Sequence, residues 1–217
     1  MGVAAKKQSE ELSPGREKIL GAAEQEFSAS GFEAASMKAI STRADVSQAL
    51  LHYHFGSKER LYAEVIRARS KKINDSRRAL LDQVDFESDD ALSQVLEALF
   101  RPALAPEGGG KAYARIFAGM IVGRAHDREL VRECYDPTAH VFLDAIQRAC
   151  PGMGIEGAGA VYQFALGVLV SALSRDGRME RLMGHQGALL GDQILIRKIV
   201  TFVVGGAAAL TEDRERL

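Results

Sequence analysis

The stretch that decides the fold is SMKAISTRADVSQALLHYHFGSKERL, residues 36–61. Apolar residues recur at three- to four-residue spacing over residues 37–44, which predicts a short helix with one buried face. A tight turn follows at residues 45–46, and Ser47 is a suitable N-cap for a second short helix. A longer helix then begins with Ser57 as its cap. Two short helices joined by a few residues form a helix-turn-helix, whose second helix enters the major groove of DNA.

A further helix is predicted before this stretch, at residues 14–30. Proline occupies its first position, apolar residues repeat every four residues, and Gly31 ends it. With this helix in front, the motif closely resembles the DNA-binding domain of the TetR (tetracycline-repressor) family of bacterial transcription regulators. The resemblance covers residues 14–65 in motif detail, and the remainder only in length and all-helical character. It implies a DNA-binding regulator, and the habit of the family favours a repressor over an activator.

The resemblance also implies which side chains meet DNA. Lys38 and Gln48 match the positions of base readers: Gln can pair with adenine, and Lys can donate to guanine. Ala49 and Leu50 are apolar and could pack only on thymine methyl groups or sugars. Asp45 stands where the family most often has Gly. The full predicted DNA-contacting set, including side chains expected on phosphates, is Ser36, Lys38, Ser47, Gln48, Ala49, Leu50, His52, Tyr53, His54 and Lys58. The alternative for Lys38 and Gln48 is plain solvent exposure.

Charge and cysteine content agree with a cytoplasmic DNA-binding protein. Residues 1–72 carry 12 Lys and Arg against nine Asp and Glu, although the whole chain has a net charge of −1. The basic part is therefore the part that contains the motif. Two cysteines, Cys134 and Cys150, are too few for a disulfide scaffold, and a polar start to the chain predicts no signal peptide. The cysteines are interpreted as small apolar residues, with a redox pair as the alternative.

The pattern along the whole chain predicts an all-α fold of about nine helices. We expect a disordered tail at residues 1–13, a helix-turn-helix DNA-binding domain at 14–57 and a ligand-binding and dimerisation domain at 58–217. No segment alternates apolar and polar residues over the length of a strand. Beyond the motif, helices are expected at residues 58–83, 88–104, 111–125, 128–135, 137–149, 156–174 and 193–210, with a long loop at 177–193.

The last two long helices are predicted to join a homodimer. Each has an apolar stripe at helical spacing, and glycines would let the helices approach closely. The stripes are Val161, Phe164, Ala165, Val168, Leu169 and Ala172, and Ile196, Ile199, Val200, Val203 and Ala207. Two helices from each subunit would form a four-helix bundle, and a dimer places two recognition helices about 34–36 Å apart on palindromic DNA. The alternative is that both stripes are core within one chain. The short apolar run at 199–210 predicts a buried helix of a soluble protein.

A pocket for a small-molecule effector is predicted on the helix at residues 111–125. Five residues share one of its faces, and a guanidinium stands at the end of this apolar stripe: Tyr113, Phe117, Met120, Ile121 and Arg124. Neighbouring helices could complete the wall with Phe100, Tyr135, His140 and Phe142. Such a pocket suits an amphipathic molecule, including an anionic one. The alternative is that the stripe is ordinary core.

Enzyme, cofactor and metal functions are disfavoured. The chain has no G-x-S-x-G, no phosphate-binding glycine loop and no zinc-protease signature, so we expect no catalytic residues and no cofactor. His52 and His54 diverge by about 200° on a helix and cannot easily share one metal ion. A second hypothesis remains, in which a helical small-molecule-binding or scaffolding protein carries a degenerate helix-turn-helix that does not bind DNA.

Overall fold

The computed structural model describes residues 14–105, 108–122, 125–174, 178–184 and 191–213. Within these ranges every regular element is a helix, which confirms the predicted all-α fold. The helices are α2 (Pro14–Ala34), α3 (Met37–Ala44), α4 (Gln48–Phe55), α5 (Lys58–Leu81), α6 (Ala91–Leu104), α7 (Gly110–Val122), α8 (Ala125–Cys134), α9 (Asp136–Ala149), α10 (Ile155–Ser174), α11 (Arg178–Met183) and α12 (Asp192–Asp213). The tail expected at residues 1–13 lies outside the described residues.

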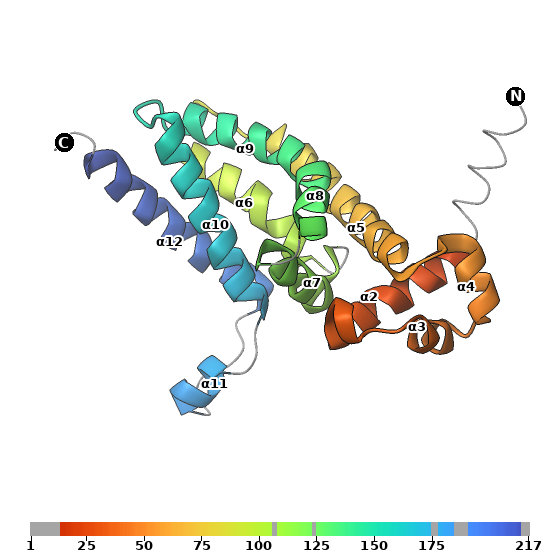
Figure 1. Ribbon diagram of the computed structural model, residues 1–217. Coiled ribbons are helices and arrows are strands. Elements are labelled where there is room, and N and C mark those ends of the chain that lie inside the picture. The colour runs from red at the N-terminus through yellow and green to blue at the C-terminus, as the bar shows by residue number, and fades with distance from the viewer. Residues whose placement is uncertain (1–13, 106–107, 123–124, 175–177, 185–190, 214–217) are drawn as a thin grey trace, which may run out of the picture.

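One expected loop contains a helix. The described chain has eleven helices where about nine were expected, and α11 lies inside the 177–193 segment interpreted as a loop. Its sequence, RMERLM, consists of good helix formers but is too short to show a periodic apolar face. Figure 1 shows α11 projecting away from the other helices.

Three serines and one glycine set the boundaries of the first helices. The hydroxyl groups of Ser36, Ser47 and Ser57 each accept a hydrogen bond from the backbone N–H three residues ahead, so each caps the helix that follows. Gly31 interrupts α2 with a φ of 72°, a conformation that glycine adopts without steric cost. The helix break predicted at Gly31 is therefore present, with a short additional turn after it.

Two hydrophobic clusters form the core, and α5 contributes to both. One cluster joins α2–α4, most of α5 and parts of α7 and α8. The other joins α6, α9, α10 and α12 to the C-terminal end of α5. Figure 1 shows α2–α4 at one end of the molecule, α10 and α12 side by side at the other, and α5 running between them. A movement of α5 therefore affects packing at both ends.

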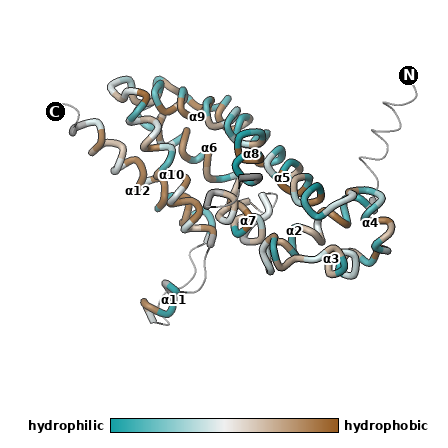
Figure 2. Tube along the Cα trace, in the orientation of Figure 1, coloured by the Kyte–Doolittle hydropathy of each residue, from teal (hydrophilic) through white to brown (hydrophobic). Residues whose placement is uncertain are grey.

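Helix α12 is buried on one side only, which differs from the expected buried helix. Its residues Ile196, Val200 and Val203 are buried, whereas the side chain of Phe202 is 71% exposed. Both α10 and α12 are apolar along most of their length (Figure 2). By length and composition, segments Ile155–Leu173 and Asp192–Thr211 could each cross a membrane, but core helices of soluble proteins pass the same test. Because monomeric proteins rarely expose a continuous apolar patch, we expect another surface to pack on this side of α12.

Candidate DNA-binding surface and effector cavity

The turn between α3 and α4 has the geometry of a helix-turn-helix. Asp45 adopts a left-handed conformation, with φ 51° and ψ 52°, and it is the one non-glycine residue with positive φ in the described chain. The N–H of Val46 donates to the carbonyl of Ser41 at 3.0 Å. Leu51 is fully buried and holds α4 against the rest of the domain. The departure from glycine at Asp45 therefore leaves the turn intact, because Asp tolerates this conformation better than most residues.

The opposite side of α4 is open to solvent. Gln48 and Ala49 are exposed, Leu50 is 39% exposed and Tyr53 is 74% exposed. On α3, Lys38 is exposed as well. These predicted contact residues therefore form one accessible face around the start of α4.

Three predicted contact residues also hold the local structure. The hydroxyls of Ser36 and Ser47 are the caps described above. Nδ1 of His52 donates a hydrogen bond to the carbonyl of Gly56 at 2.8 Å, so Nε2 is the ring nitrogen that remains for another contact. His54 is half-buried beside the rings of Tyr53 and Phe55.

Lys58 contacts protein carbonyls, whereas the sequence predicted a contact with a DNA phosphate. Its ammonium donates to the carbonyls of Phe32, Glu33 and Ala35, at 2.8, 3.1 and 3.0 Å, and lies 4.5 Å from the centre of the Phe32 ring. The last turn of α2 has no basic residue of its own, so Lys58 supplies the positive charge that suits a helix C-terminus. This geometry gives Lys58 an architectural role. The lack of a basic residue at the end of α2 is the one feature of the sequence that could have indicated this role of Lys58.

A cavity of about 530 Å³ lies between α5, α7, α8, α9 and α10. Its wall consists of Arg77, Phe117, Ala118, Val131, Tyr135, Asp136, Ala139, Tyr162, Gln163, Leu166, Gly167 and Val170. A small adjoining space of about 20 Å³ brings in Tyr113 and Leu169 beside Arg77. The volume falls in the range of about 300–1,000 Å³ that small-molecule sites occupy.

The structure brings three of the residues predicted for an effector pocket to these spaces and places others elsewhere. Phe117 and Tyr135 line the cavity, and Tyr113 lines the adjoining space. Phe100, Phe142 and Met120 are almost wholly buried in the two cores and do not line either space. The sequence could not show this, because a periodic apolar stripe indicates that a helix face is buried but not whether it faces a core or a cavity. His140 is exposed on α9. Arg124 and the side chain of Ile121 lie outside the described residues.

The cation in the cavity wall is Arg77, which the pattern of apolar residues did not predict. Its side chain is buried, and Nε donates to the carbonyl of Leu99 at 3.0 Å. In the sequence it stands within the charged stretch at residues 67–78, where no pocket residue was expected. The signal was its spacing: Ile73, Arg77 and Leu81 repeat every four residues, and all three are buried.

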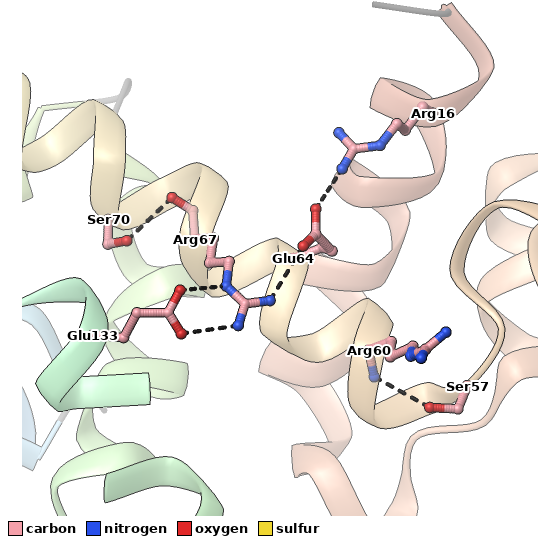
Figure 3. Close-up of polar contacts among 7 residues, drawn as sticks. All are labelled: Arg16, Ser57, Arg60, Glu64, Arg67, Ser70 and Glu133. Atoms are coloured by element: carbon pink, nitrogen blue, oxygen red, sulfur yellow. Dashed lines mark hydrogen bonds and ion pairs between the residues drawn. The ribbon is translucent and has the colours of Figure 1, made fainter. Parts of the chain in front are cut away.

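A chain of ion pairs connects the cavity side of the molecule to the DNA-binding end (Figure 3). Arg67 on α5 contacts Glu133 on α8 at 2.7 Å and Glu64 at 3.3 Å. Glu64 in turn contacts Arg16 on α2 at 2.5 Å. The hydrogen bonds from Arg67 lower the pKa of the Glu133 carboxyl. Because α8 also lines the cavity through Val131, these pairs connect the cavity wall to α2 and α5.

The two cysteines do not form the redox pair considered above. Cys134 and Cys150 are separated by α9, whose 14 residues span about 21 Å. A disulfide requires Cα atoms within about 7 Å. Burial raises the pKa of both thiols, which lowers their reactivity.

A second hollow lies on the exposed side of α10 and α12. This groove of about 680 Å³ is almost entirely apolar, and its residues are Val161, Gln163, Phe164, Gly167, Val168, Phe202, Val203, Gly206, Ala207 and Leu210. Phe164 is 59% exposed, whereas Val161, Ala165 and Leu169 of the predicted dimer stripe are buried within the chain. The stripe on α10 is thus partly intrachain core, and the accessible apolar surface is rotated towards Phe164.

Fold and surfaces together define a helix-turn-helix DNA-binding protein with a separate helical domain that contains a cavity. Comparison with known sequences agrees. Residues 19–65 match the family described as bacterial regulatory proteins, tetR family, and residues 94–206 match the tetracyclin repressor-like C-terminal domain. The chain therefore belongs to the TetR family of bacterial transcription regulators, whose members are DNA-binding proteins and not enzymes.

Individual relatives support the same assignment. The chain is 36% identical over 106 residues to the HTH-type transcriptional regulator UidR of Escherichia coli (strain K12), a match that covers 45% of this chain and 51% of UidR. The match thus spans about half the length of that relative. The fold is similar to the fatty acid degradation regulator FadR from Bacillus halodurans (TM-score 0.66, 14% identity, 89% of this chain and 96% of that one). It is also similar to the TetR family regulator PfmR from Thermus thermophilus (TM-score 0.61, 18% identity, 85% and 96%).

Proposed function

We propose that this protein is a homodimeric, ligand-responsive transcriptional repressor that binds palindromic operator DNA in the cytoplasm. The observation that carries the proposal is the accessible face of α4. One side of this helix is held by the fully buried Leu51, while Gln48, Ala49 and Tyr53 on the other side are exposed. A recognition helix needs both properties, since a loose helix cannot place donors against base edges.

Within this proposal the exposed residues divide into two roles. Lys38 and Gln48 read bases, and the hydroxyl of Tyr53 and the free Nε2 of His52 contact phosphates. Lys58 is not part of this surface, because its ammonium is held by protein carbonyls.

The groove on α10 and α12 supports a dimer built from these helices. Phe164 and Phe202 expose large apolar surfaces, which monomeric proteins rarely leave uncovered in a continuous patch. A second copy of the chain would cover them by two-fold symmetry. The effector would bind in the cavity beside α5 and shift that helix, and with it α4.

Selection of binding sites from random DNA tests the proposal. The wild-type protein should enrich a palindrome. Gln48→Ala should lose its base preference at one base pair of each half-site, which corresponds to about 1–3 kcal/mol of lost discrimination at that base pair. Lys72→Ala, at an exposed position on α5 outside the predicted contact set, is the control for loss of a surface side chain. Enrichment of no sequence would contradict operator binding and favour a helical protein with a degenerate motif. An unchanged preference in Gln48→Ala would contradict the base-reading role alone.

A further inference from the structure

Arg77 is a buried cation without a buried counter-charge. Its side chain is 4% exposed, yet within the part of the chain that the structure describes no carboxylate lies within 4.0 Å of it. Placing an ionised group in a protein interior costs several kcal/mol unless an opposite charge or several hydrogen bonds compensate for it. Desolvation accordingly lowers the pKa of the guanidinium, although an arginine remains protonated near neutral pH.

The guanidinium is held in a fixed position by two neutral acceptors. Nε donates to the carbonyl of Leu99 at 3.0 Å, and Nη1 donates to Oδ1 of Asn74 at 3.4 Å. Asn74 is itself buried, and its Nδ2 donates to the carbonyl of Cys134 at 2.7 Å. Asn74 is thereby fixed in the orientation that presents its oxygen to Arg77. The structure thus positions the arginine without neutralising it.

The remaining donors of Arg77 are available to the cavity. Nη2 has no hydrogen-bond partner among the described residues, and it is not sealed from a water-sized probe. Arg77 borders both the main cavity and the small adjoining space. Nη2 and the second N–H of Nη1 can therefore donate to a molecule that enters.

The phenols beside Arg77 do not supply the missing charge. Burial raises the pKa of Tyr113, Tyr135 and Tyr162, so all three are neutral near neutral pH. The hydroxyls of Tyr113 and Tyr135 are hydrogen-bonded to each other. Asp136 also borders the cavity, but it is exposed and does not lie within 4.0 Å of the guanidinium. The negative charge that suits Arg77 must come from a ligand.

We propose that the cavity binds an amphipathic organic carboxylate, with its carboxylate paired to Arg77 and its apolar body along Phe117, Leu166 and Val170. A guanidinium presents parallel N–H donors that match the two oxygens of a carboxylate. The three apolar residues lie on α7 and α10 in the same cavity wall. Asp136 disfavours a second anionic group at the rim. The inference rests on the proposed function only where it treats this ligand as the effector.

Binding of paired probes to the full-length protein tests the charge preference. The probes are decanoate against decanol, and 4-phenylbutanoate against 4-phenylbutanol, measured by titration calorimetry and by the rise in melting temperature. The wild type should bind each carboxylate at least tenfold more tightly than the matched alcohol. Arg77→Met keeps the length of the side chain but removes the charge, so it should bind both members of a pair equally.

Controls separate this result from misfolding. Arg78→Met changes the adjacent, exposed arginine and should retain the wild-type preference. Arg77→Lys keeps the charge but lacks the planar pair of donors, so it should retain part of the preference for the carboxylate over the alcohol. Binding of the alcohols to Arg77→Met, together with an unchanged helical circular dichroism spectrum, shows that the cavity is still formed.

Three results would overturn the inference: equal binding of carboxylate and alcohol by the wild type, an undiminished preference in Arg77→Met, or no binding of either carboxylate at millimolar concentration. Release of the selected operator DNA is measured separately by fluorescence anisotropy. Tight carboxylate binding without release would leave the ligand inference intact and contradict the effector response in the proposed function.

Discussion

Replacing Lys58 with Met separates a structural role from a DNA-binding one. Lys58→Met keeps the aliphatic stem but removes the ammonium that donates to three carbonyls at the end of α2. A hydrogen bond to a charged group contributes about 1.5–3 kcal/mol when it is buried. Because Lys58 is half-buried and water can replace part of these bonds, we expect a total loss of about 2 kcal/mol, including the contact with the Phe32 ring.

Two measurements follow from this estimate. In a chain of this length, a loss of about 2 kcal/mol lowers the melting temperature by about 4–8 °C, which calorimetry can resolve. Affinity for operator DNA is measured at several salt concentrations, since each lost phosphate contact reduces the slope of log K against log salt by about 0.9. We expect the slope for Lys58→Met to equal that of the wild type. Lys38→Met, at an exposed position on α3, is the matched control: it should leave the melting temperature unchanged and weaken DNA binding.

The opposite pattern would refute the reasoning. If Lys58→Met left stability within about 0.5 kcal/mol of the wild type and lowered the salt slope by about one, the ammonium would act on phosphate, as the sequence analysis expected. Lys58→Arg distinguishes charge from geometry, because it keeps the charge but has a different donor arrangement.

Three further outcomes are expected. Phe202→Glu should convert the dimer to a monomer in light scattering, whereas Thr201→Glu, beside the groove, should not; a dimeric Phe202→Glu would place the interface elsewhere. Asp45→Gly should raise the free energy of unfolding in urea by about 0.5–1 kcal/mol, because it relieves the left-handed backbone, and a loss of stability would contradict this. The folded-state pKa of Glu133 is lowered, so its stabilisation is present above the unfolded pKa of about 4.3 and disappears as pH falls through the folded value. Glu133→Gln should therefore reduce stability at pH 7 by at most about 1 kcal/mol and by less at pH 3, and an equal loss at both would exclude the ion pair.

Local signals in the sequence predicted the helix-turn-helix accurately. Ser36, Ser47 and Ser57 cap helices through bonds to residues three positions ahead, and Gly31 breaks a helix through its own backbone. Each effect depends on residues within one helical turn, so a linear reading contains the necessary information.

Longer-range contacts could not be predicted in the same way. Lys58 reaches carbonyls 23 to 26 residues earlier in the chain, and nothing at either site indicates the other. The apolar stripe that ends at Arg124 predicted the cavity cation there, whereas the cation that lines the described cavity is Arg77. Apolar periodicity indicates which face of a helix is buried, but not whether the buried face meets a core or a cavity. For the same reason, the sequence did not show that one side of α10 packs in the core while another side lines the exposed groove.

The positions of Lys58 and Arg77 make α5 a direct mechanical connection between the proposed sites. Arg77 follows Lys58 by 19 residues on one helix, which is about 28 Å along its axis. A rotation of about 4° at the Arg77 end moves the other end by about 2 Å, similar to the helix shifts of known regulatory transitions. Only Gly56 and Ser57 separate α4 from α5, and Lys58 joins the end of α2 to the same point. We therefore expect a ligand that pulls on Arg77 to displace α4 and α2 together, and any loss of DNA affinity that it causes requires an equal loss of ligand affinity when DNA is bound.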